Sequence, residues 1–251
     1  MKYPQQLIDR VSVPMPADLF IVAGSTPVVS FGNPATSKVA TLGINPSSSE
    51  FSYGKDQPLL SKEEKRLIDL EVLQIADSRS LTLEESERVI DGCNSYFDSD
   101  LHYEWFLKLE EIVLKPAGFT YYGEDASACH LDLVQWATDP VWSRITSPAV
   151  RKKLLTDDKE FLRFQLSNYK FDYVYLNGGT VVEQFMALDI AELTVVHHVT
   201  RNAMGGTHKV FKGAANGTTY LGWGINAASN DANRIGLAEL SQWIKTQESI
   251  K

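Results

Sequence analysis

Short apolar segments alternate with segments of helical periodicity along this chain, and that alternation constrains its fold more than any other feature. Apolar runs typical of buried strands cover residues 39–43, 130–136, 173–177, 194–198 and 218–223. Helical patterns cover residues 62–76, 83–93, 102–114, 149–166, 181–188 and 232–245. Strands that alternate with helices pair in parallel, because a parallel connection must cross back over the sheet. The sequence therefore predicts an α/β fold with a largely parallel sheet.

Composition excludes several classes of protein. Of the 251 residues, 43% are apolar and 22% are charged, which is ordinary for a globular protein with a real core. The longest apolar runs fall well short of the roughly 18 residues that span a bilayer, and the N-terminal residues lack the apolar stretch of a secretory signal. Cys93 and Cys129 have neither metal-ligand spacing nor the numbers of a disulfide framework. We therefore expect a cytoplasmic protein with no membrane partner, no metal and no cofactor.

Charge is unevenly distributed. Residues 55–111 contain 15 Asp and Glu against 7 Lys and Arg, and within them we expect residues 55–100 to form an acidic helical insertion. Residues 197–217 contain no acid, although the whole chain has a net charge of −8. The bases of this segment are Arg201, Lys209 and Lys212. The segment is either a hairpin with a few solvated bases or a surface that contacts phosphate.

Two loops rich in Asn and Ser follow predicted strands. Gly-Ile-Asn-Pro at residues 43–46 ends the first strand, where ligands of open α/β sheets bind. The amide of Asn45 can both accept and donate a hydrogen bond, so it can hold a water molecule in one orientation. Residues 226–230 form a second such loop. Alone, an Asn-Pro step is also a common turn.

The order of these motifs resembles the uracil-DNA glycosylase superfamily, and most closely its mismatch-specific uracil/thymine branch. Residues 43–46 resemble the first motif of that branch, and Asn-Ala-Ala-Ser at 226–229 is similar to its second motif. The aromatic segment 103–120, ending in Ala-Gly-Phe-Thr, and the turn at 175–180 resemble the elements expected between them. The resemblance extends over residues 36–246. It implies a single domain over residues 1–251, folded as a three-layer α/β/α sandwich with a central, mostly parallel sheet.

The sequence also departs from the family pattern. Ser47 replaces a usual Gly in the first motif, Ala227 replaces the Pro of the second, and the acidic insertion separates Asn45 from the aromatic segment. These departures bear on the substrate more than on the reaction. Two cysteines cannot supply the four-cysteine iron–sulfur cluster of some branches.

The resemblance implies a monofunctional DNA glycosylase, acting as a monomer on double-stranded DNA that contains a modified or mispaired pyrimidine. Such an enzyme extrudes the target nucleotide and hydrolyses its N-glycosidic bond to leave an abasic site. The expected catalytic residues are Asn45 and Asn226. The expected base-binding residues are Gly43, Ile44, Pro46, Ser47, Phe51, Phe97 and Asp132, with Phe97 and then Phe51 favoured for stacking on the base. The expected DNA contacts are Ala227, Ala228, Ser229, Asn230, Arg201, Lys209 and Lys212.

Asp132 suggests a particular target base. It lies where the family tends to place an Asn that reads the edge of uracil. An ionised Asp only accepts hydrogen bonds, so it suits the N4 amine of cytosine and repels O4 of uracil. Because unmodified cytosine must be spared, the preferred target is a modified cytosine, such as the sugar-bearing hydroxymethylcytosine of phage DNA that antiphage relatives remove.

Other interpretations stay open. Asp132 could instead anchor a loop, and the protein could be a uracil/thymine mismatch glycosylase. It could also be a catalytically inactive relative that binds modified DNA or a partner protein. An α/β hydrolase is disfavoured because the sequence has no Gly-x-Ser-x-Gly elbow.

Overall fold

The computed structural model describes residues 2–52, 65–76, 79–99, 103–201, 205–229 and 234–248. The chain divides into two compact units, each assembled from separate stretches of sequence. Unit 1 comprises Met1–Asn33, Ile44–Tyr96 and Leu131–Leu166, and unit 2 comprises Pro34–Gly43, Phe97–His130 and Ser167–Lys251.

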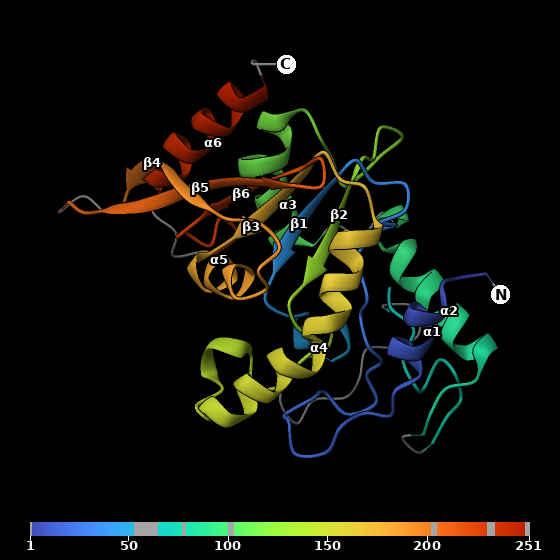
Figure 1. Ribbon diagram of the computed structural model, residues 1–251. Helices are drawn as coiled ribbons and strands as arrows, with labels where there is room; N and C mark the ends of the chain where they lie inside the picture. Colours follow the sequence, from blue (N-terminus) through green and yellow to red (C-terminus); the bar gives the residue numbers. More distant parts are fainter. Residues whose placement is uncertain are drawn as a thin grey trace. The chain divides into compact units, whose positions relative to one another are not determined.

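A six-stranded sheet has the strand order β2-β1-β3-β6-β5-β4 (Figure 1). The strands are β1 (Val39–Gly43), β2 (Ala128–Asp132), β3 (Tyr173–Asn177), β4 (Thr194–Thr200), β5 (Thr207–Ala215) and β6 (Thr218–Trp223). β3 pairs in parallel with both β1 and β6, whereas β5 pairs antiparallel with both β6 and β4. The predicted α/β class with a mostly parallel sheet is confirmed, and the packing of helices on the sheet is compatible with a three-layer sandwich.

Three predicted strands have the observed bounds, and the predicted strand at 130–136 does not. β2 ends at Asp132 because the chain beyond it pairs outside the sheet. The amide of Val134 donates to the carbonyl of Ile44 at 2.9 Å, and the amide of Val28 donates to the carbonyl of Gln135 at 2.7 Å. The residues after Asp132 therefore belong to a loop of unit 1.

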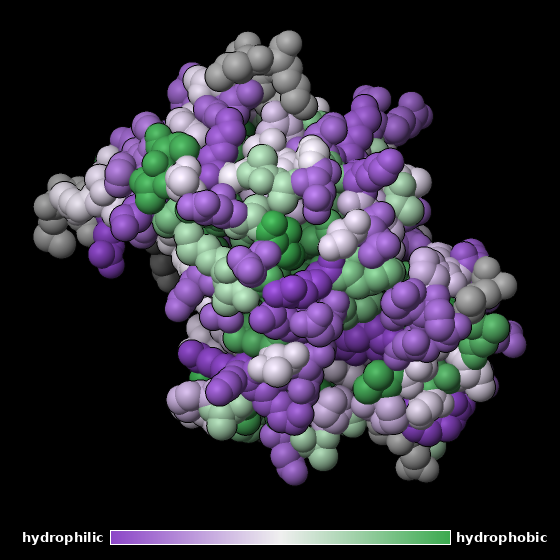
Figure 2. Space-filling model, in the orientation of Figure 1, coloured by the Kyte–Doolittle hydropathy of each residue, from purple (hydrophilic) through white to green (hydrophobic). Residues whose placement is uncertain are grey.

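In its described part, the acid-free segment at 197–217 forms a hairpin, and phosphate contact by this segment stays a prediction. β4 and β5 pair antiparallel, with a register shift between Val195 and His197. β4 is the terminal strand of the described sheet, and its Val195 and Val196 are exposed. An apolar patch lies on the surface where Figure 1 places β4, among mostly hydrophilic residues (Figure 2).

The helices of unit 1 include α1 (Gln5–Ser12) and α2 (Leu83–Asn94), which pack on each other, the 3-10 turn η1 (Ser48–Glu50), and most of α4 (Pro148–Asn168). α2 begins with a capping box, in which Thr82 and Glu85 satisfy each other's backbone amides. The sequence analysis did not predict α1, whose Leu7, Ile8 and Val11 are buried. A cluster of Leu19, Val134, Trp136, Ile145 and Leu154 forms an apolar core in this unit.

The predicted helix at 62–76 is wrong in its described part, because residues 65–76 form turns and bends. The amide of Leu70 donates to the carbonyl of Gly24 at 2.9 Å instead of to a preceding turn of helix. The Asp69 carboxylate accepts from the amide of Val72, an arrangement typical of turns. Residues 62–64 lie outside the described part of the chain.

The helices of unit 2 pack against its strands. α3 (Glu104–Leu109) continues as the π-helical η3 (Glu110–Leu114) and the 3-10 turn η4 (Lys115–Ala117), in agreement with the predicted helix from its first described residues. α5 (Gly179–Met186) contacts β3 and β6, and α6 (Arg234–Glu248) contacts β4, η3 and η4. His197 of β4 stacks on Trp243 of α6 with the ring planes 5° apart.

We predict that Gly222→Ala destabilises unit 2 by about 1–3 kcal/mol. A Cβ at Gly222 would lie 2.8 Å from Cγ2 of Val182 and 3.2 Å from Cβ of Leu176. Gly179→Ala is the matched control, since its Cβ would meet nothing closer than 3.7 Å. Urea denaturation of both variants measures the effect, and equal midpoints would contradict it.

Candidate functional site

Asn45 lies directly after β1, and its side-chain NH₂ group is held by three acceptors in unit 1. Nδ2 donates to the carbonyl of Pro46 at 3.0 Å, the carbonyl of Trp136 at 3.3 Å and Oγ1 of Thr138 at 3.1 Å. The side chain is half-buried. Within the described residues, no hydrogen bond engages its Oδ1 atom. The amide is therefore fixed in orientation and presents one acceptor atom.

The backbone joins the same two loops. The amide of Val134 donates to the carbonyl of Ile44, and Ser47 and Thr138 form a parallel β-bridge. Pro46 is buried and Ser47 is exposed, while the Ser47 side chain caps η1 by accepting from the amide of Ser49. Gly43, at the end of β1, is buried. The turn that carries Asn45 is thus tied to the loop after β2, which we call the 132–138 loop.

Glu50, at the end of η1, is a buried acid that was not predicted from the sequence as part of a site. Its two carboxylate oxygens each accept from the hydroxyl of Tyr96 at 2.9 Å, and Nη2 of Arg66 lies 3.6 Å from Oε2. The pKa of Glu50 is raised to about 7. Burial is the main cause and the charge of Asp132 adds to it, while Arg66 and the hydroxyl of Tyr96 oppose the rise. An acid five residues beyond Asn45 was the only signal in the sequence.

Asp132 is buried at the end of β2, and both of its carboxylate oxygens are shielded from solvent. Its backbone carbonyl accepts from Nε2 of Gln135 at 2.9 Å. The negative charge of Asp132 helps to raise the pKa of Glu50, so the two acids of unit 1 interact electrostatically. The carboxylate is therefore not open to solvent in this structure, and its role in base binding stays a prediction.

Neither predicted stacking residue offers an open ring face. Phe51 is fully buried, and Phe97 is 6% exposed. Phe97 stacks on Tyr121 with ring centroids 4.5 Å apart and meets Phe106 edge to face. These rings pack in apolar interiors, which corrects the stacking roles given to them from the sequence.

In unit 2, Asn226 is exposed and its amide is also held in one orientation. Oδ1 accepts from Nδ2 of Asn177 and from the amide of Ala228, each at 3.1 Å. Oδ1 of Asn177 in turn accepts from the amide of Ala227 at 2.8 Å and from Nε1 of Trp223 at 3.2 Å. Asn177, which the sequence analysis did not select, is therefore the residue that shapes this loop.

The other predicted contacts of this loop have different surroundings. Ala227 and Ala228 are buried, so their methyl groups offer no surface, while Ser229 is half-buried. Asn230 lies outside the described residues. Because their side chains pack inward, the methyl groups of Ala227 and Ala228 are not available to DNA, and the DNA contact of this loop stays a prediction.

The basic residues of the hairpin do not share one face. Arg201, Lys209 and Lys212 are exposed, but Lys209 and Lys212 are three residues apart on β5 and point to opposite faces. Nζ of Lys212 donates to Gln247 of α6 at 3.1 Å. Burial and the charge of Arg201 lower the pKa of His208. Lys209 and Lys212 therefore cannot contact the same backbone together.

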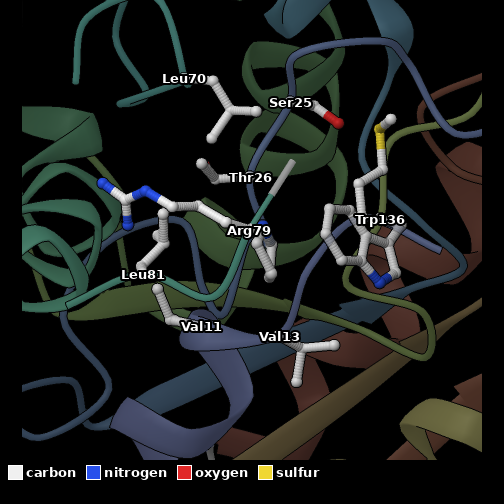
Figure 3. A pocket seen from close by; sticks show the side chains of 10 residues that line it. Val11, Val13, Ser25, Thr26, Leu70, Arg79, Leu81 and Trp136 are labelled. Carbon is white, nitrogen blue, oxygen red and sulfur yellow. The ribbon is translucent and has the colours of Figure 1, made fainter. Parts of the chain in front are cut away.

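A small pocket, partly open to solvent, lies elsewhere in unit 1 (Figure 3). Its lining is mostly apolar and includes the ring of Trp136, with Arg79 as its charged member. Arg79 is engaged by both carboxylate oxygens of Glu85 at 2.9 and 2.6 Å. The lining contains none of the residues expected to bind a base.

Cys93 and Cys129 are both buried, free thiols. Burial raises the pKa of Cys93 to about 11 and that of Cys129 to about 12, so neither supplies a thiolate near neutral pH. Among the described residues, no group of three or more His, Cys, Asp or Glu side chains is arranged to hold a metal ion. Within the same part of the chain, no helix is both long and apolar enough to cross a bilayer.

A scan against models of known protein families and a search of curated proteins found no match to this chain.

We predict that ionisation of Glu50 weakens folding as the pH rises from about 4.5 to about 7. The folded state holds this proton more tightly than the unfolded chain, so stability is lost as the pH rises through that window. The loss amounts to about 3 kcal/mol at most. Urea midpoints at pH 5 and pH 8 measure it, and Glu50→Gln should remove this component. Identical pH dependence in the two proteins would contradict the prediction.

Proposed function

We propose that this protein is a monofunctional DNA glycosylase, which extrudes a modified pyrimidine and hydrolyses its N-glycosidic bond to leave an abasic site. The observation that carries the proposal is the fixed amide of Asn45 at the carboxyl end of β1. Three acceptors hold its NH₂ group, and its Oδ1 atom has no partner among the described residues. The order of motifs along the chain supports the same reaction class.

Asn45 suits the orientation of a water molecule better than the removal of its proton. A neutral amide hardly accepts a proton, so it does not act as an effective general base. It can accept one hydrogen bond from a water and thereby aim the oxygen at the anomeric carbon. The reaction then depends on positioning and on stabilisation of the oxocarbenium-like sugar and the departing base, which makes the chemistry slow.

The proposed target is a modified cytosine, with phage DNA that carries sugar-bearing hydroxymethylcytosine as the preferred example. In the proposal, Asp132 is the acceptor for the N4 amine of a cytosine-type base, and because both of its oxygens are buried, this contact requires the 132–138 loop to move when DNA binds. The exposed, small side chain of Ser47 leaves room beside the first loop. This substrate implies antiviral defence in the cytoplasm, whereas excision of uracil or thymine from mismatches would imply repair.

In the proposal, DNA is contacted by exposed donors of unit 2. Asn226 is exposed, and its Oδ1 atom is already engaged, so its NH₂ group is the part available to a phosphate or sugar. Lys209 and Arg201 add positive charge on the hairpin. Such contacts hold the backbone and carry no sequence information.

We predict that Asn45→Ala lowers the rate of base release by at least about 100-fold while duplex binding stays within about threefold, because only the positioned water is lost. The assay is abasic-site formation followed by alkaline strand breakage, with the released base identified by mass. The control is Ser49→Ala in the adjacent turn. An unchanged rate in Asn45→Ala would end the proposal. Wild-type protein that binds modified DNA but releases no base from any substrate would favour the inactive relative instead.

We predict that Asp132→Asn shifts the preference from a modified cytosine toward uracil, because an amide can donate to O4 whereas a carboxylate cannot. Release rates of both bases from matched duplexes, measured for wild type and variant, test the expected reversal. Efficient excision of uracil by the wild-type protein would contradict this substrate assignment and support the mismatch enzyme.

A further inference from the structure

The 132–138 loop supplies two of the three groups that hold the Asn45 amide. These are the carbonyl of Trp136 and the hydroxyl of Thr138. The orientation of Oδ1 of Asn45 therefore depends on where this loop is held. The same loop begins at Asp132, so one backbone segment positions both residues.

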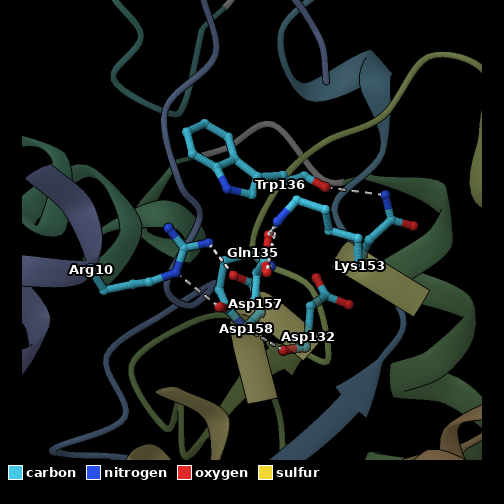
Figure 4. A network of polar contacts seen from close by, with 8 residues as sticks. Arg10, Asp132, Gln135, Trp136, Lys153, Asp157 and Asp158 are labelled. Atoms are coloured by element: carbon cyan, nitrogen blue, oxygen red, sulfur yellow. Dashed lines mark hydrogen bonds and ion pairs between the residues drawn. The ribbon is translucent and has the colours of Figure 1, made fainter. Parts of the chain in front are cut away.

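Arg10 of α1 holds this loop through a buried polar network (Figure 4). Its Nε donates to Oε1 of Gln135 at 3.2 Å, and its Nη2 donates to Oδ1 of Asp158 at 2.7 Å. The other oxygen of Asp158 accepts from the backbone amide of Gln135 at 2.7 Å. Arg10 of α1 thus binds the side chain of Gln135, and Asp158 of α4 binds its backbone amide.

The network also reaches the residues on either side of Gln135 in the loop, Asp132 and Trp136. Nε2 of Gln135 donates to the carbonyl of Asp132, and the guanidinium of Arg10 lies 5.4 Å from the ring centroid of Trp136. The side chains of Arg10 and Asp158 are only 9% and 3% exposed. A guanidinium that donates in two fixed directions from a dry site limits the movement of its partners.

We infer that Arg10 is a positioning residue for the Asn45 site, which it controls by fixing the 132–138 loop through Gln135 and Asp158. This inference rests on the proposed function for its kinetic readout. It predicts that the amide of Asn45 loses its single orientation when the network is cut, although Arg10 does not itself touch Asn45.

α1 has anchors that do not involve Arg10. Leu7, Ile8 and Val11 are buried, and Lys2 and Tyr3 both contact the carboxylate of Asp91 in α2. Removal of the Arg10 side chain therefore leaves the helix attached. It takes away the guanidinium contacts with Gln135 and Asp158, while the backbone bonds of the loop to Ile44 and Val28 remain. The hydrogen bonds of Arg10 to Gln135 and Asp158 can therefore be removed without detaching α1.

The decisive experiment compares three variants of the full chain. Arg10→Met removes the guanidinium. Gln135→Met removes the side-chain hydrogen bonds of Gln135 to Arg10 and to the carbonyl of Asp132. It keeps the backbone amide of residue 135, which still donates to Asp158. Lys153→Met is the matched control, because it removes an exposed ion pair with Asp157, the neighbour of Asp158 on α4. Circular dichroism and thermal unfolding verify folding, and Gln135→Met decides the outcome if Arg10→Met does not fold.

The first readout is independent of activity. In ¹H–¹⁵N spectra, the side-chain NH₂ signals of Asn45 are assigned by their disappearance in Asn45→Ala. We expect these protons to exchange with solvent at least about tenfold faster in Arg10→Met and Gln135→Met than in wild type, and unchanged in Lys153→Met. Unchanged exchange in a folded Arg10→Met or Gln135→Met protein would overturn the inference.

The second readout is base release. We expect kcat to fall about 10- to 100-fold in the two network variants with KM within about threefold, because the loss concerns alignment and not substrate binding. Equal kcat values in active wild-type and variant proteins would overturn the inference. If wild-type protein releases no base but the Asn45 exchange rates change as expected, the proposed function fails and the positioning role of Arg10 stands.

Discussion

The junction between the turn after β1 and the loop after β2 determines the local structure on which unit 1's candidate site depends. It consists of one backbone hydrogen bond from Val134 to Ile44, one β-bridge between Ser47 and Thr138, and the bonds of Asn45 to Trp136 and Thr138. Each loop alone would leave polar backbone groups without partners. Together they satisfy those groups and leave one amide oxygen for other chemistry.

The two asparagines that follow strands β1 and β6 are held in complementary ways. Asn45 has its donor group occupied, so it presents an acceptor. Asn226 has its acceptor occupied by Asn177 and Ala228, so it presents a donor. The same residue type therefore serves opposite purposes, and the neighbouring hydrogen bonds decide which. This difference supports the separate roles proposed for them, one toward water and one toward the nucleic acid backbone.

Local pattern was sufficient to predict much of the fold. β1, β3 and β6 have the predicted bounds, because each is a short run rich in β-branched, aliphatic and aromatic residues that ends at Gly, Asn or Trp before a turn. The predicted continuation of β2 beyond Asp132 and the described part of the predicted helix at 62–76 failed for one reason. In both segments, backbone groups bond to residues distant in sequence, as Leu70 does to Gly24. Periodicity within a segment carries no information about such partners.

The candidate site was predicted less completely than the fold. Asn45 and Asp132 could be selected because their types and strand-end positions suggest chemistry. The contacts of Arg10 and Glu50 could not be foreseen, since Arg10 meets Gln135 across 125 positions of sequence and Glu50 meets Tyr96 across 46. The aromatic residues failed for the opposite reason, because sequence alone does not separate a ring that packs in the core from one that faces a ligand.

The irregular pairing in β4 has a consequence for how the molecule behaves at high concentration. A terminal strand with exposed valines is a template on which further strands can add, and this is a common route to insoluble polymers. The register shift between Val195 and His197 interrupts the even spacing that an incoming strand would need. The register shift thus disfavours the addition of strands from other molecules at this edge of the sheet, and it does so without a charged residue among the exposed valines.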